Sequence, residues 1–189
     1  MSTFYPNLYA QIEAFRPGCD QESADRQRML AQMTLRPDLL IRDDPVMHFT
    51  ASSWIVSPDR RVLLVWHELY RSWSWTGGHA DGEEDLLAVA MREAMEETGL
   101  REVRPVIPEI FSLEILGVAG HEKRGTFIGA HLHLNATYLL EADPALPLAP
   151  APGETKDVAW FDVQEVLSLS SEPHMIPIYR KLIEKTRTI

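Results

Sequence analysis

The sequence predicts an α+β fold in which helices cover a β-sheet, and three observations support this prediction. The chain has 189 residues, of which 45% are hydrophobic and 24% are charged, so its size and composition suit one globular domain with a small appendage. Runs of residues with strand-like patterning begin at residue 48 and recur as far as residue 161. Only a few helical patterns interrupt them, and they are well separated along the chain.

The first 45 residues differ from the rest and are expected to form a helical N-terminal extension. Residues 5–15 and 22–34 show helical periodicity, and the helix breaker Arg16-Pro17-Gly18 separates them. Residues 35–44 contain proline and aspartate and are expected to form a linker. The extension could act as a lid, form a homodimer contact or simply pack on the main domain at 46–189, and the sequence leaves these three roles open.

From residue 48 onward the elements can be predicted in order. The first two strands are expected to pair as a hairpin around the turn Ser57-Pro58-Asp59-Arg60. The expected strands are 48–56, 61–67, 104–118, 126–140 and 157–161. The expected helices are 84–98, 162–167 and 176–186, the first of which should end at Gly99. The expected loops are 68–76, a glycine-rich segment at 117–125 and a segment at 143–153 rich in proline and alanine.

Charge and composition exclude several classes of partner. The chain has 18 lysines and arginines against 28 aspartates and glutamates, a formal net charge of −10, and a field of that sign repels nucleic acids and anionic membranes. The apolar runs, such as residues 62–66, are too short to cross a membrane, and the N-terminus lacks the pattern of a secretory signal. The single cysteine, Cys19, excludes an internal disulfide and favours a cytoplasmic location.

The most informative segment places three glutamates on one face of the helix expected at 84–98. Glu93, Glu96 and Glu97 have the spacing i, i+3, i+4, so their side chains are neighbours at the carboxyl end of that helix. Like charges at this spacing, and anions at this end of the helix dipole, both destabilise a helix. A solvated acidic face would explain the pattern, and so would a hard divalent cation with oxygen ligands, Mg²⁺ or Mn²⁺, which commonly binds substrate phosphates.

Residues 78–100 resemble the Nudix box, G-x5-E-x7-R-E-U-x-E-E-x-G-U, where U is a bulky aliphatic residue. The matching positions are Gly78, Glu84, Arg92, Glu93, Glu96, Glu97, Gly99 and Leu100. A chance match is on the order of one in a million for a chain of this length and average composition. Ala94 stands at the first U position and is smaller than usual, and Thr76 stands where many family members have proline.

The resemblance implies a Nudix-type α/β/α sandwich with a mixed sheet, and hydrolysis of a nucleoside diphosphate linked to another group. It implies that Glu93, Glu96, Glu97 and the Gly78 carbonyl bind Mg²⁺ or Mn²⁺. It further implies that Arg92 and Glu84 orient the site, as an ion pair. The general base stays open between Glu97 and Glu154, with Glu122 ranked behind them.

Residues outside the box are weaker candidates for binding the substrate, a nucleotide or another small organic pyrophosphate. Trp73 and Trp75 lie just before the two glycines and could stack a nucleobase, although most large aromatic residues belong to the core. His131 and His133 share a strand face with Asn135 and Thr137 and could contact the substrate, bind a transition metal as a pair, or form internal hydrogen bonds.

Two other functions remain as alternatives to hydrolysis. One is a nucleotide-sensing Nudix module without catalytic activity, although every carboxylate of the box is present. The other is an enzyme like isopentenyl diphosphate isomerase, which would need a catalytic cysteine in the core, whereas Cys19 lies in the extension.

Overall fold

A computed structural model describes residues 4–68, 70–123 and 125–189. The helices are α1 (Pro6–Ala14), α2 (Asp20–Leu35), α3 (Leu86–Thr98), α4 (Val166–Leu169) and α5 (Ile176–Thr186). The strands are β1 (Met47–Val56), β2 (Arg61–His67), β3 (Ser72–Ser74), β4 (Thr76–His79), β5 (Arg104–Pro105), β6 (Ser112–Val118), β7 (His121–Lys123), β8 (Thr126–Ile128), β9 (His131–Glu141) and β10 (Thr155–Asp162).

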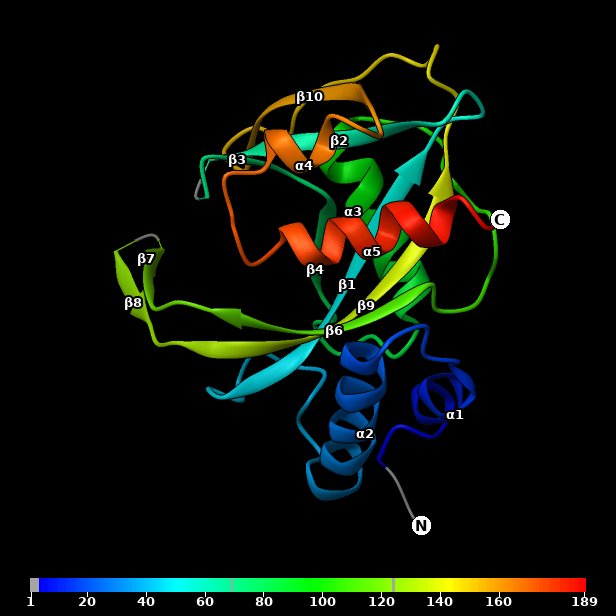
Figure 1. Cartoon of the computed structure of the whole chain (residues 1–189). Helices are drawn as coiled ribbons and strands as arrows, with labels where there is room; N and C mark the ends of the chain where they lie inside the picture. The colour runs from blue at the N-terminus through cyan, green and yellow to red at the C-terminus, as the bar shows by residue number, and fades with distance from the viewer. Residues whose placement is uncertain (1–3, 69, 124) are drawn as a thin grey trace. The chain divides into compact units, whose positions relative to one another are not determined.

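The main sheet has the strand order β10-β2-β1-β9-β5, with β3 beside β2, β4 beside β1 and β6 beside β9. Strands β1 and β9 run in the same direction (Figure 1), whereas β2 is antiparallel to β1 and to β10. The sheet is therefore mixed, and the fold is α+β, as predicted. By the packing of its residues the chain divides into two compact units: the first holds the chain up to residue 51 with 78–89 and 108–138, and the second holds 52–77, 90–107 and 139–189.

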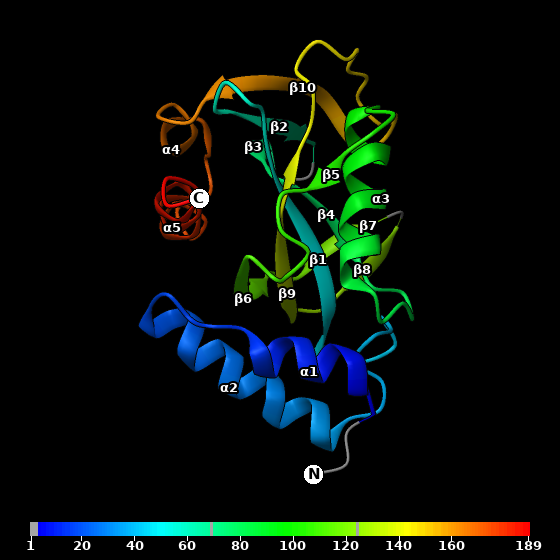
Figure 2. The same cartoon turned by 90° about the vertical axis from the view of Figure 1, so that its right-hand side faces the viewer.

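The first unit contains the helical extension. Helices α1 and α2 lie side by side (Figures 1 and 2), and both bury apolar side chains, including Leu8, Ile12, Met29 and Met33. Helix α2 also packs against β6, where the Asp25 carboxylate accepts the backbone N–H of Ile115 at 3.0 Å. Strand β6 pairs antiparallel with β9, from Ser112 opposite Thr137 to Val118 opposite His131.

The second unit has an apolar core between its strands and helix α5. Strand β2 is buried over residues 62–65 and pairs antiparallel with β1, β3 and β10. The fully buried ring of Tyr179 on α5 stacks on the Trp54 ring of β1, with 5.9 Å between the ring centroids. The indole N–H of Trp54 donates to the hydroxyl of Thr186 at 3.1 Å, so the last turn of α5 is held against the strand.

Most of the predicted elements are confirmed. The two helices of the extension, the β1–β2 hairpin, the box helix and the C-terminal helix all form close to their expected bounds. The hairpin turn places Arg60 in the left-handed region at φ 66°, and Ile55 pairs with Leu63 across it. Gly99 follows α3 with φ 72°, which confirms it as the residue that ends the helix.

Two long predicted strands are interrupted. The strand expected over 104–118 is divided into β5 and β6, since Pro105 and Pro108 supply no N–H donor for a continuous ladder. The strand expected over 126–140 is divided at Gly129 into β8 and β9. The glycine-rich loop expected over 117–125 contains β7, which pairs with β8.

Two shorter expectations are also wrong. The loop expected over 68–76 contains β3, because residues 72–74 pair with β2. The helix expected over 162–167 begins only at Val166, since the Asp162 carboxylate accepts the Gln164 N–H at 2.8 Å and forms a turn in its place.

Candidate active site

Helix α3 carries the arginine and the three glutamates of the box and is anchored at its carboxyl end. Ala94 is fully buried, so the small residue at this position fits a close approach of the helix to its surroundings. The Thr98 carbonyl accepts the N–H of Ala149 at 2.8 Å, and the Glu97 carbonyl accepts the Thr155 hydroxyl at 3.3 Å. These contacts fix the last turn of the helix, from which Glu97 projects.

Glu97 is the most buried carboxylate of the box, with 6% of the residue exposed. The backbone N–H of Gly77 donates to its Oε2 at 3.3 Å. Burial raises the pKa of Glu97 to about 8; the Gly77 hydrogen bond opposes this shift, and the negative charges of Glu93, Glu154 and Glu96 add to it. The ionised carboxylate is thus unfavourable in the protein alone and would be stabilised by a cation beside it.

Glu93 and Glu96 differ in their exposure. The Glu93 side chain is 19% exposed, and burial raises its pKa, although its ion pair with Arg92 opposes the shift. The Glu96 side chain is 62% exposed. Arg92 lies 3.1 Å from a Glu93 oxygen and 4.0 Å from a Glu96 oxygen, so within the second unit it pairs with the carboxylates next to it on the helix.

Glu154, the predicted candidate outside the box, is near these carboxylates. It lies in the exposed turn before β10, directly after Gly153, whose φ is 82°. Its negative charge raises the pKa of both Glu93 and Glu97. Glu154 is therefore close enough to interact electrostatically with these carboxylates of the box. Glu122, the third candidate base, is exposed on β7 in the first unit.

Glu84 has partners that the sequence did not predict. Its Oε1 accepts the backbone N–H groups of Asn7 at 2.9 Å and Leu8 at 3.0 Å, the second and third residues of α1. The carboxylate therefore supplies the N-terminal cap of that helix, which has no cap from its own side chains. The predicted pairing of Glu84 with Arg92, and the predicted role of the Gly78 carbonyl, stay predictions.

The two tryptophans proposed for base stacking both have packing partners. Trp75 is 9% exposed and meets the Tyr179 ring edge-on, with 5.7 Å between the centroids. Trp73 is half-buried between Trp66, at 5.7 Å, and Phe161, at 4.6 Å. Trp73 is thus the more accessible of the two, and stacking of a base by either residue stays a prediction.

The predicted polar face of β9 serves two purposes within the first unit. Asn135 and Thr137 donate to the buried carboxylate of Glu114 at 3.1 and 2.8 Å, so these two residues form internal hydrogen bonds. His131 and His133 lie 3.1 Å apart, measured between their Nε2 atoms, and are close to His48 and His79.

His48 and His79 are site residues that the sequence does not predict. Each is a single histidine in a strand, and 30 or more residues separate them from each other and from β9. The one local signal is the position of His79 directly after the two glycines of the box turn.

Comparison with known proteins identifies the family of the chain. The model of the NUDIX domain matches residues 47–182, which include the box helix and leave out α1 and α2. The chain belongs to the NUDIX family. A search of curated protein sequences gives no match. With this domain, and with solved neighbours that are Nudix hydrolases, the chain is assigned to the hydrolases of phosphoric anhydrides.

Solved structures confirm the fold. The Nudix hydrolase RenU from M. smegmatis is 22% identical, with a TM-score of 0.55 over 75% of this chain and 87% of that one. The E. coli dihydroneopterin triphosphate pyrophosphohydrolase is 14% identical, with a TM-score of 0.54 over 72% of this chain and 94% of that one. A C. elegans Ap4A hydrolase is 15% identical, with a TM-score of 0.53 over 75% and 98%.

The carboxylates of α3 fit a hard divalent cation. Carboxylate oxygens are the ligands that Mg²⁺ and Mn²⁺ prefer, and several from one helix leave coordination positions for substrate phosphates and water. The buried, crowded position of Glu97 is the structural observation that favours a cation there, because a positive charge would offset both its burial and the neighbouring negative charges.

Proposed function

We propose that this NUDIX hydrolase is a divalent-metal-dependent pyrophosphohydrolase of the cytoplasm. Its substrate would be a nucleoside diphosphate derivative or a nucleoside triphosphate, modified nucleotides included. The observation that carries this proposal is the buried Glu97 carboxylate with the charges of Glu93, Glu96 and Glu154 around it. The structural neighbours, which include a triphosphate pyrophosphohydrolase and an Ap4A hydrolase, support the choice of substrate class.

In the proposed site Glu93, Glu96 and Glu97 hold Mg²⁺ or Mn²⁺, and the Gly78 carbonyl is a further ligand. The bound cation would neutralise charge on the pyrophosphate and lower the pKa of a water molecule. A water oxygen then bonds to phosphorus while the bond from that phosphorus to the leaving phosphate oxygen breaks. A carboxylate accepts the proton of the water.

The positions of the carboxylates suit them to two roles, binding the cation and accepting the proton of the water. Glu93 is kept in place by Arg92 at 3.1 Å, which suits a ligand with a fixed geometry. Glu154 projects from an exposed turn and is not part of the helix, so it could approach a water from outside the box. Glu97 and Glu154 are therefore the two candidates for the base, and Glu122 ranks behind them. We also propose that Trp73 contributes to recognition of the base.

The test is a screen with Mg²⁺ and with Mn²⁺ over nucleoside triphosphates, nucleotide sugars, dinucleoside polyphosphates and dihydroneopterin triphosphate. We expect release of phosphate, pyrophosphate or a nucleoside monophosphate from at least one class. EDTA should abolish the release, and Mg²⁺ or Mn²⁺ alone should restore it. Calorimetric binding of a nucleotide with no hydrolysis under either metal would contradict the proposal and favour a sensing module.

A further inference from the structure

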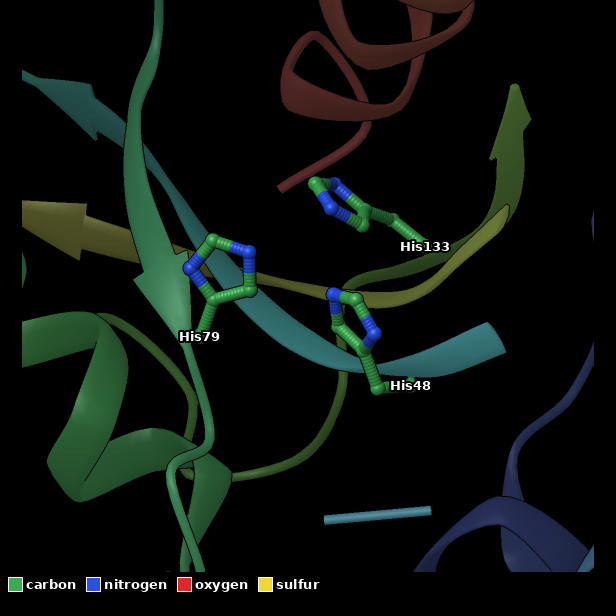
Figure 3. Close-up of side chains that lie close together, drawn as sticks. All are labelled: His48, His79 and His133. Carbon is green, nitrogen blue, oxygen red and sulfur yellow. The ribbon is translucent and has the colours of Figure 1, made fainter. Parts of the chain in front are cut away.

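Three histidines from three separate strands converge in the first unit. His48 lies on β1, His79 ends β4 and His133 lies on β9, and each offers a ring nitrogen within 4.8 Å of the other two. The ring centroids are 5.0 to 5.1 Å apart in all three pairs. Figure 3 shows the three rings around a common space. None of the box carboxylates belongs to this cluster.

The central histidine is buried, and among the described residues its ring nitrogens have no hydrogen bond of ordinary geometry. His48 is 5% exposed, and both of its ring nitrogens are inaccessible. A buried polar atom left unpaired is costly, so such atoms are normally paired with protein, water or an ion. Burial lowers the pKa of His48; the Asp44 backbone opposes this shift, and the charges of His131 and Arg42 add to it.

A fourth histidine sets the tautomer of His133. The Nδ1 of His131 lies 2.9 Å from the Gly129 carbonyl, which can only accept, so Nδ1 carries the proton. The Nε2 of a neutral His131 is then an acceptor, and it lies 3.1 Å from the Nε2 of His133. With that form of His131, His133 donates from Nε2, which leaves a lone pair on Nδ1. Histidine ligands of metals commonly donate their second N–H in this way.

We propose that His48, His79 and His133 bind a divalent transition-metal ion such as Zn²⁺, with His131 as a positioning residue. Three imidazoles match the nitrogen ligands of Zn²⁺, Co²⁺ or Ni²⁺ and do not suit Mg²⁺, which prefers oxygen. Three protein ligands leave a fourth position for water or another donor. The inference rests on the histidine geometry alone and does not depend on the proposed hydrolysis.

The experiment is calorimetric titration of the full, untagged chain with Zn²⁺ in the presence of excess Mg²⁺, which occupies oxygen sites. We expect about one Zn²⁺ per chain and a higher melting temperature with zinc. Substitution of Co²⁺ should give the intense visible absorption of a tetrahedral nitrogen site. Absence of zinc binding, or the weak spectrum of octahedral Co²⁺, would overturn the proposal.

Substitution of single histidines tests whether they are the zinc ligands. His79→Phe and His133→Phe each keep a ring of similar shape and should weaken zinc binding by about tenfold or more. His174→Gln removes an exposed histidine of the second unit and is the matched control, with zinc affinity unchanged. Circular dichroism checks that each variant folds. Zinc binding that survives His79→Phe and His133→Phe but is lost in Glu93→Gln would show that zinc binds the box carboxylates instead.

Discussion

At the scale of single residues, the three box glutamates on α3 have different surroundings, although the motif requires the same residue type at each position. Glu97 is buried and accepts a backbone N–H, whereas Glu96 is largely exposed. The i, i+3, i+4 spacing was sufficient to place these side chains together, because helix geometry fixes their relation. The histidine cluster could not be found in this way, since only the folded strands bring His48, His79 and His133 to one place.

Substitution of Glu97 tests its role directly. Glu97→Gln keeps the size of the side chain and an oxygen that can accept the Gly77 N–H, so we expect the fold to be retained. It removes a cation ligand and a candidate base, so kcat should fall by about 100-fold or more. Steady-state kinetics on the best substrate of the screen measures this. Glu102→Gln, at an exposed glutamate just outside the box, is the matched control, and equal rates in the two variants would remove Glu97 from the mechanism.

Glu154→Gln addresses the choice of base. If Glu154 accepts the proton, this variant should lose about 100-fold or more in kcat while its affinity for Mg²⁺ stays close to that of the wild type. Rate assays combined with metal titrations separate the two effects. A normal kcat would leave Glu97 as the stronger candidate.

His131 is expected to act through His133. His131→Phe retains a ring against His48 but removes the acceptor for the His133 N–H, so zinc affinity should fall by about 10- to 100-fold. His131→Gln supplies an amide oxygen as an acceptor and should restore part of the loss. Titration with Zn²⁺ measures both variants, and wild-type affinity in His131→Phe would refute the tautomer argument.

At the scale of elements, those with strong local signals could be predicted and those that depend on pairing could not. The hairpin turn, the box helix and the glycine that ends it follow from local sequence, and the structure confirms them. The short strands β3 and β7 were missed because three-residue strands have too few positions to show an alternating pattern, and only their partners β2 and β8 define them.

The end of α3 makes Gly99 sensitive to substitution. Its φ of 72° disfavours any side chain, and an added Cβ would lie 2.8 Å from the Ala149 Cβ. Gly99→Ala should lower the free energy of unfolding by about 2 kcal/mol or more, as measured by urea denaturation. Gly117→Ala is the control, because a Cβ there meets nothing within 4 Å, and a loss of equal size in both variants would contradict this account.

The cap of α1 provides a further test at this scale. Glu84→Ala leaves the N–H groups of Asn7 and Leu8 without their acceptor, so the helix should lose about 1 kcal/mol. Hydrogen exchange at Leu8 should become faster in the variant. Glu83→Ala, one residue earlier, is the control, since the Glu83 carboxylate accepts from Asp85 and not from α1.

At the scale of the whole molecule, the helical extension is built into the first unit. The family match begins at residue 47 and so leaves out α2. Yet α2 bonds to β6 twice: the Asp25 carboxylate accepts a backbone N–H of β6, and the Glu22 carboxylate accepts the Ser112 hydroxyl at 2.7 Å. We therefore expect a chain that begins at residue 46 to melt at a lower temperature than the full chain, by circular dichroism. Equal melting temperatures would show that the extension is energetically separate. Of the helices described, none is long and apolar enough to span a membrane.

The cap on α1 has a thermodynamic consequence for the molecule as a whole. The Glu84 oxygen that accepts from Asn7 and Leu8 belongs to a residue of the Nudix box. The same carboxylate is therefore both the cap of α1 and a predicted partner of Arg92. A rearrangement that draws this oxygen away to a guanidinium would leave the N–H groups at the start of α1 without their acceptor. By reciprocity, a partner that stabilises the capped form of α1 would disfavour the pairing of Glu84 with a guanidinium by the same free energy.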